Sequence, residues 1–242
     1  LTADIDLNNQ EWTPIGTYLG GGCKDYFCGT FDGGGHKISG LSIKKTWSGM
    51  NSDIWNSNSN YTFDCYNYCS YGLFGAAGKN AVFQNLTIES PVITLDQAKN
   101  VGALLGGVSY AGNGGEVTIS NVNVTNANIE ANARVGGMVG WVIDSTHGVI
   151  ISDCSVTGNI SAVFNDSVGT DGDDGDKAGG IVGQVSSAST IINCSYSDGT
   201  VSAYREAAGI VGTYAGGDQV LAGCKVAEVT VEQDKTSGTY SA

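Results

Sequence analysis

Proline, histidine and positive charge are all scarce in this chain. Its 242 residues include 2 prolines, 2 histidines and 11 lysines and arginines, against 24 aspartates and glutamates. The net charge of -13 argues against nucleic-acid binding, which depends on Lys and Arg meeting phosphates, and against attraction to an anionic membrane surface. No run of about 20 apolar residues is present, so the sequence predicts neither a membrane-spanning helix nor a signal peptide.

Glycine, in contrast, is abundant, and much of it lies in one recurring motif. Short apolar stretches such as "VGGMVGWV" are bracketed by glycines, and the closing glycines are Gly75, Gly106, Gly140, Gly183 and Gly212. Their spacings of 31, 34, 43 and 29 residues are typical of solenoids, propellers and arrays. A helical solenoid is disfavoured, because the segments are β-branched and each glycine costs a helix about 1 kcal/mol relative to alanine.

A second motif follows each glycine motif, as in "ISNVNV" and "ISDCSV", and a sixth copy precedes the first. The third residue of each copy is Gly, Asn or Asp: Gly40, Asn85, Asn121, Asp153, Asn193 and Gly223. These three residue types adopt left-handed backbone at low cost. Ile119, Val122 and Val124 can all point inward only if the strand alternation slips once, so the pattern predicts a bend at Asn121.

A third strand is predicted after the bend in the later repeats. Its inward positions are Ile129 and Ala131, Ile160 and Ala162, and Val201 and Ala203. Propeller blades would need hairpin turns, which the spacing does not supply. The sequence therefore predicts an all-β fold, a right-handed parallel β-helix (solenoid) of about six coils, each with three short strands, that occupies residues 1–242 as a single domain.

Three stretches resemble a known family when they are taken together. "LTADIDLNNQEWTPIGT", "GTFDGGGHKISGLSI" and "YGLFG" are similar to the opening of GLUG-motif proteins, bacterial cell-surface proteins named for a Gly-Leu-any-Gly signature. The match at residues 72–75 is complete, whereas later copies replace the leucine. The resemblance implies a right-handed, pectin-lyase-like β-helix, as in regions flanking immunoglobulin A1 proteases.

Those proteases carry a zinc HExxH motif, and this chain departs from it. Its two histidines, His36 and His147, lie outside any such motif. The resemblance therefore implies a secreted or surface-exposed module, part of a longer polypeptide, that has no peptidase site of its own. Leu1 begins inside a predicted strand, which also favours excision from a longer secreted chain.

A long insertion at residues 46–71 interrupts the repeat between the first two coils. It is rich in aromatic side chains, interleaved with Asn and Ser, a composition that glycan-binding and protein-binding surfaces use. The alternative is a satellite core that pins the loop to the solenoid wall. The candidate ligand-binding residues are Trp47, Trp55, Tyr61, Phe63, Tyr66 and Tyr68.

Seven cysteines fall into two groups. Four lie in irregular loops, Cys23, Cys28, Cys65 and Cys69, and predict two disulfides, with a zinc site as the rival interpretation. The other three, Cys154, Cys194 and Cys224, occupy the inward position that Leu41, Leu86 and Val122 occupy in earlier coils. They are expected to stack as buried, unpaired small hydrophobes.

Two sets of charged residues are candidate sites. The spacer "NDSVGTDGDDGDKAGG" offers Asp171, Asp173 and Asp176 as weak calcium candidates, although a solvated turn fits the spacing better. Lys99, Arg134, Lys177 and Arg205 precede the glycine motifs and predict a basic stripe at one corner. Such a stripe balances nearby acidic residues or meets an acidic glycan.

The sequence thus predicts no metal or cofactor and no catalytic residues. The expected function is a non-catalytic stalk or adhesin module, extracellular or at the cell surface, that binds a host glycan or surface protein through the aromatic insertion. The alternatives are a polysaccharide lyase or hydrolase on the same scaffold and an accessory region of a larger surface protease. Function resides in sites carried by a fold, so the fold class alone does not separate them.

Overall fold

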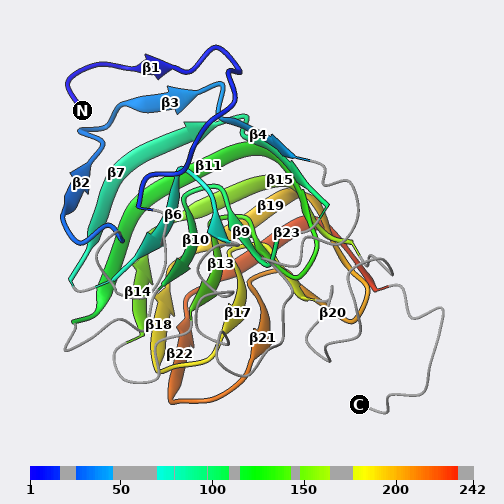
Figure 1. Cartoon of the computed structure of the whole chain (residues 1–242). Helices are drawn as coiled ribbons and strands as arrows, with labels where there is room; N and C mark the ends of the chain where they lie inside the picture. Colours follow the sequence, from blue (N-terminus) through cyan, green and yellow to red (C-terminus); the bar gives the residue numbers. More distant parts are fainter. Residues whose placement is uncertain are drawn as a thin grey trace, which may run out of the picture.

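The computed structural model describes residues 1–16, 26–45, 70–78, 80–96, 98–108, 115–142, 148–163 and 177–233. Within these ranges the strands form three sheets, and the strands in each sheet pair in parallel. Figure 1 shows the coils stacked from the N-terminal strands, in blue, to the C-terminal strands, in orange and red. The chain is a parallel β-helix, as the sequence predicts.

The first sheet, here called sheet A, forms the long curved wall in Figure 1. Its members among the described residues are β1 (Ile5–Asp6), β2 (Thr30–Asp32), β3 (Lys37–Ser39), β4 (Ser42–Lys45), β7 (Val82–Glu89), β8 (Val92–Leu95), β11 (Val117–Ala131), β14 (Val149–Ser152), β15 (Ser155–Ala162), β18 (Ser189–Ile192), β19 (Ser195–Ala203), β22 (Gln219–Ala222) and β23 (Lys225–Gln233).

The other two sheets come from the glycine motifs, and each has five strands among the described residues. Sheet B consists of β6 (Phe74–Ala77), β10 (Leu105–Val108), β13 (Val139–Val142), β17 (Val182–Val185) and β21 (Val211–Tyr214). Sheet C consists of β5 (Ser70–Tyr71), β9 (Asn100–Gly102), β12 (Arg134–Gly136), β16 (Lys177–Gly179) and β20 (Glu206–Ala208). Each coil therefore runs from sheet C to sheet B and then along sheet A.

The predicted bend is present in all six copies. Its residues have positive φ values of 69°, 54°, 50°, 55°, 52° and 66°, at Gly40, Asn85, Asn121, Asp153, Asn193 and Gly223. The bend residues also form a ladder between coils. The Asn121 side-chain amide donates to Asn85 Oδ1 at 3.0 Å, and that of Asn193 donates to Asp153 Oδ1 at 3.1 Å.

A second bend, which the sequence analysis did not predict, lies further along sheet A. Its positive-φ residues are Ser90, Asn126, Gly158, Asp198 and Glu228. Each glycine motif contains two strands rather than one, so a full coil such as β12–β15 has four strands, distributed over three sheets. The sequence predicts three short strands per coil, and the inward positions of the third are buried as expected.

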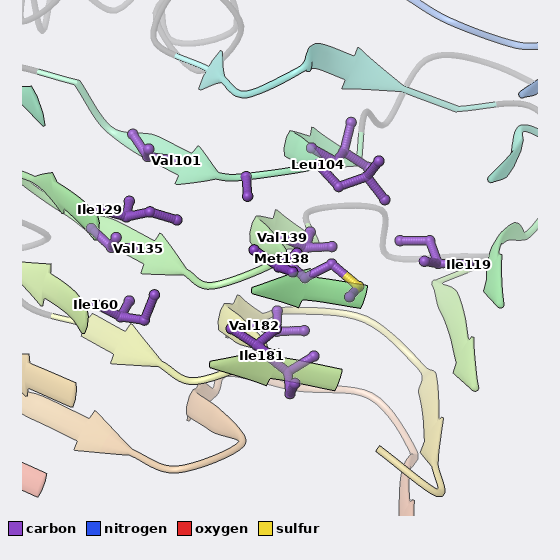
Figure 2. Close-up of a cluster of buried hydrophobic side chains, with 14 of the residues drawn as sticks. Val101, Leu104, Ile119, Ile129, Val135, Met138, Val139, Ile160, Ile181 and Val182 are labelled. Carbon is purple, nitrogen blue, oxygen red and sulfur yellow. The ribbon is translucent and has the colours of Figure 1, made fainter. Parts of the chain in front are cut away.

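The core lies between sheet A and the inner faces of sheets B and C. Its side chains stack in columns, one from each coil, as Figure 2 shows for Leu104, Met138 and Ile181 and for Ile129 and Ile160. All five of these side chains are at most 1% exposed. Burial of such columns is the main favourable contribution to folding of a solenoid. Among the described residues, no helix has the length and apolar character needed to cross a bilayer.

Candidate functional site

The variable parts of this chain are concentrated at two corners of the coil. The turn from sheet C to sheet B always has two residues, such as Gly137 and Met138. The register of the strands fixes where the other connections begin and end. From sheet B to sheet A they contain 4, 9, 7 and 4 residues in successive coils, and from sheet A to sheet C they contain 4, 2, 14 and 2.

The corner connections explain the irregular repeat lengths. In repeats of 31, 34, 43 and 29 residues the connections contain 8, 11, 21 and 6 residues in total. The residues that remain, which we call the frame, number 23, 23, 22 and 23. The missing residue of the third frame coincides with a register shift between Thr157 and Ile160. The solenoid therefore has a constant frame, and the corners accept insertions. The largest insertion, between Lys45 and Ser70, has 24 residues.

Glycines bring the two corners close together in space. A Cβ atom added to Gly140 in β13 would lie 2.3 Å from the Val101 nitrogen in β9, and one added to Gly106 in β10 would lie 2.4 Å from the Tyr71 nitrogen in β5. Sheets B and C thus pack backbone against backbone, which requires glycine. The end of each sheet B strand consequently lies beside the beginning of a sheet C strand. The residues at which the corner connections join the sheets, which we call their roots, therefore lie on the same side of the coil.

Six polar and aromatic side chains fill the space between these roots, and we call them the polar cluster: Ser70, Asn100, Arg134, Trp141, Gln184 and Ser186. The Arg134 guanidinium carbon lies 4.1 Å from the Trp141 ring centroid, and Arg134 Nε donates to Gln184 Oε1 at 2.6 Å. The Trp141 indole N–H and the Gln184 amide both donate to Ser186 Oγ. In the neighbouring coil Asn100 Nδ2 donates to Ser70 Oγ at 3.2 Å.

Five of the six residues of the polar cluster are buried and Ser186 is half-buried, which limits the chemistry of the cluster. Arg134 is 2% exposed and Asn100 is fully buried. The groups brought together here are a guanidinium, an indole, amides and hydroxyls, which hold hydrogen bonds but do not exchange protons near neutral pH. Within the described ranges, no three His, Cys, Asp or Glu side chains converge as a metal site. The arrangement is suited to fixing the roots of the corner connections rather than to acid–base catalysis.

The predicted basic stripe is only partly formed. Arg134 and Lys177 are register partners, but Lys99 and Arg205 lie one position earlier in their coils. The column of Arg134 and Lys177 continues to Asn100 on one side and to Glu206 on the other. Arg134 and Lys99 are both buried. A continuous exposed stripe for an acidic ligand is therefore not what the fold produces.

Most of the other predicted site residues lie outside the described residues. These are Trp47, Trp55, Tyr61, Phe63, Tyr66 and Tyr68, the cysteines Cys23, Cys65 and Cys69, and the aspartates Asp171, Asp173 and Asp176. Of the loop cysteines only Cys28 is described, and it is exposed and forms no disulfide within the described part of the chain. The binding, disulfide and calcium assignments therefore stay predictions.

The predicted thiol column is present, with one difference at its end. Cys154 and Cys194 are buried and free, at 2% and 1% exposure, and Cys154 Sγ accepts a hydrogen bond from the Val122 N–H at 3.4 Å. The neighbouring Cys194 thiol and burial both raise the pKa of Cys154. Cys224 is only partly buried, so the expectation that all three are buried was wrong for Cys224, which lies in the last coil.

Two carboxyl groups with lowered pKa values, those of Asp4 and Asp32, lie near the N-terminus. The Lys37 backbone N–H and then the His36 ring hold the pKa of Asp4 below its usual value. The Gln84 side-chain amide, the Gly34 backbone N–H and Asn85 do the same for Asp32. The Asp32 carboxylate organises the local turn at Gly34, whereas that of Asp4 ties the N-terminal residues to His36 and Lys37; both are exposed, and these contacts are typical of structural roles.

No protein-family model matches the chain. A stretch of 147 residues, 59% of the chain, is 32% identical to halomucin of Haloquadratum walsbyi (strain DSM 16790 / HBSQ001), and the match covers 1% of halomucin. The chain thus spans a small fraction of that relative. It is also similar to a crystal structure from Bacteroides ovatus named "putative immunoglobulin A1 protease", with a TM-score of 0.57, 17% identity and coverage of 99% of this chain and 71% of that one. That likeness shows the fold alone.

Proposed function

We propose that this chain is a β-helical segment of a longer extracellular surface protein, and that it presents binding loops from its corners without catalysing a reaction. Its ligand is a host glycan or surface protein, and the aromatic insertion at residues 46–71 carries the contact. Membership of the GLUG-motif surface proteins belongs to the same proposal and is supported by the "GLFG" sequence at residues 72–75. The match to a small part of halomucin supports the longer polypeptide.

The observation that carries the proposal is the constant frame. β4 pairs with β8, and β5 pairs with β9, in the same register that later coils use. In the equivalent place, Asn132 and Ala133 alone connect β11 to β12. The scaffold therefore needs two residues where the chain has 24. Ordering a long loop costs conformational entropy, which a plain stalk would have no reason to incur.

A loop replacement tests the proposal. Residues 46–69 are replaced by Asn-Ala, the connection that the chain itself uses between β11 and β12. We expect the variant to keep its β-sheet circular dichroism and its melting temperature within a few degrees, and to lose binding on a glycan array and to host-cell surface proteins. A matched control replaces residues 163–176, the 14-residue connection between β15 and β16, in the same way and should keep binding.

Three results would overturn the proposal. If the replacement variant still binds, the insertion is not the contact. If neither protein binds any glycan or surface protein, the chain is a spacer. If the intact chain depolymerises an acidic polysaccharide, the polysaccharide-enzyme alternative is correct.

A further inference from the structure

The two ends of the solenoid differ in the described structure. At the N-terminal end, residues 1–16 lie across the first coil: β1 pairs with β3, and the Trp12 indole N–H donates to the Leu73 carbonyl at 3.0 Å. Leu1, Leu7 and Trp12 pack against the core. At the C-terminal end, β20, β21, β22 and β23 each pair with one strand of the preceding coil, and no further described strand pairs with them.

Four core columns end in exposed side chains at this C-terminal end. They are Tyr214, Leu221, Val226 and Val231, which are 42%, 48%, 48% and 48% exposed. Their register partners one coil earlier are Val185, Ile191, Tyr196 and Val201, all at most 1% exposed. The exposure thus arises because these residues are the last described members of columns whose side chains are buried in the coil before. We call these four side chains and the edges of β20–β23 the C-terminal end face.

The length of the remaining chain limits what covers this face. Nine residues, 234–242, follow β23. The frame of one coil needs 22 or 23 residues, so these nine are too few to form one. Nine residues do fall within the range of 2 to 24 residues found for connections from sheet A to sheet C. An uncovered β edge of this kind is an aggregation hazard in an otherwise well-packed protein.

We infer that the C-terminal end face is a docking surface for one further parallel coil of the same frame, which the longer polypeptide supplies. A parallel, in-register coil continues all four apolar columns and pairs the edges of all three sheets at once. A second copy related by a two-fold axis would meet the face with antiparallel strands. A second copy stacked head to tail would meet it with residues 1–16, where β1 is the one described strand, so it would not continue all three sheets. The inference rests on the proposed function only in taking the chain as a segment of a longer protein.

Cys224 makes the inference testable, because it lies on this face and its equivalents in earlier coils are buried. A copy of residues 204–233 is inserted between Gln233 and residue 234, which repeats the two-residue connection after Ala203 and adds one frame. The copied cysteine is changed to serine, so that only the original thiol reports. A Gly-Ser insert of equal length is the control. Alkylation of each cysteine is followed by peptide mapping.

In the unextended chain Cys224 should react at least about tenfold faster than Cys154 and Cys194, and the added coil should slow it by about tenfold or more while the protein stays monomeric. The Gly-Ser insert should leave the rate unchanged.

Protection of Cys224 in the unextended monomer would mean that the chain covers its own face, and protection with a dimer mass would identify a second copy. Either result overturns the inference, as does an extended variant with an exposed Cys224 or a lower melting temperature than the control. None of these readouts depends on glycan binding.

Discussion

The side-chain amide of Asn121 donates a hydrogen bond to Oδ1 of Asn85, one coil earlier, and both residues have a left-handed backbone. This pair links two requirements at one position. The bend needs a residue that tolerates positive φ. The stacking of coils also favours a residue whose side chain can both donate and accept hydrogen bonds to the bend residues of the neighbouring coils. Asparagine satisfies both, which explains its recurrence along the bend.

Replacing Asn121 with Val should therefore lower the free energy of unfolding by about 1 to 2 kcal/mol or more, because a β-branched residue at φ 50° is strained and the ladder bond is lost. Asn121→Gly should cost less, since it keeps the backbone conformation. Asn128→Val is the control, because Asn128 is exposed on a strand without positive φ. Urea denaturation of the three variants measures the difference, and equal stability of Asn121→Val and wild type would contradict the role of the bend.

Two adjacent glycines, Gly106 and Gly107, differ in whether the structure leaves space for a side chain. A Cβ on Gly106 would lie 2.4 Å from the Tyr71 backbone nitrogen, whereas one on Gly107 finds its nearest atom, Ser70 Oγ, at 3.4 Å. Gly106→Ala should destabilise the protein by about 3 kcal/mol or more, because sheets B and C must separate to admit the methyl group. Gly107→Ala should change stability by less than about 1 kcal/mol. Thermal melts of both variants decide, and similar losses at the two positions would refute backbone-to-backbone packing.

The polar cluster predicts that Arg134 is not interchangeable with lysine. Lysine keeps the charge but lacks the planar group that lies over Trp141 and the Nε that bonds Gln184. Arg134→Lys should cost about 1 to 3 kcal/mol of stability. The same exchange at Arg205, which is partly exposed, should have little effect. If chemical denaturation finds the two variants equally stable, the cluster does not fix the corner connections.

Tyr196 should make the protein sensitive to alkali. Burial raises the pKa of its phenol to about 12, and the hydroxyl donates to the Gly158 carbonyl. The folded state therefore holds this proton more tightly than the unfolded state, whose tyrosine has a pKa near 10. The contribution is complete below about pH 10 and is lost as the pH rises towards 12, by about 2 to 3 kcal/mol. Denaturation of wild type and Tyr196→Phe at pH 8 and pH 11.5 should show a smaller loss in the variant, and equal losses would contradict it.

The bend was predictable from sequence because left-handed backbone restricts the residue type. All six bend positions hold Gly, Asn or Asp, and all six have positive φ. The second bend escaped prediction because Ser90 and Glu228 share it with Asn126, Gly158 and Asp198. Neighbouring coils hold those two residues in a conformation that their own preferences disfavour, so the pattern of residue types is broken there.

The polar cluster could not be predicted for a different reason. The position of Arg134 before a glycine motif predicts a basic stripe at one corner. The outer faces of sheets B and C fold onto each other, however, and a charged residue at that position does not reveal a second buried face. The available signal was the glycine at matching positions on both strands, such as Gly136 and Gly140, which only a close backbone approach explains.

The constant frame also has a mechanical meaning. Hydrogen bonds between coils run along the solenoid axis, so tension between the two ends would open the stack one coil at a time. Each opened repeat of 29 to 43 residues would release about 100 to 150 Å of extended chain, at about 3.4 Å per residue. The long corner connections add slack to particular steps without changing the bonds that hold them. Under load the solenoid would therefore lengthen in discrete steps.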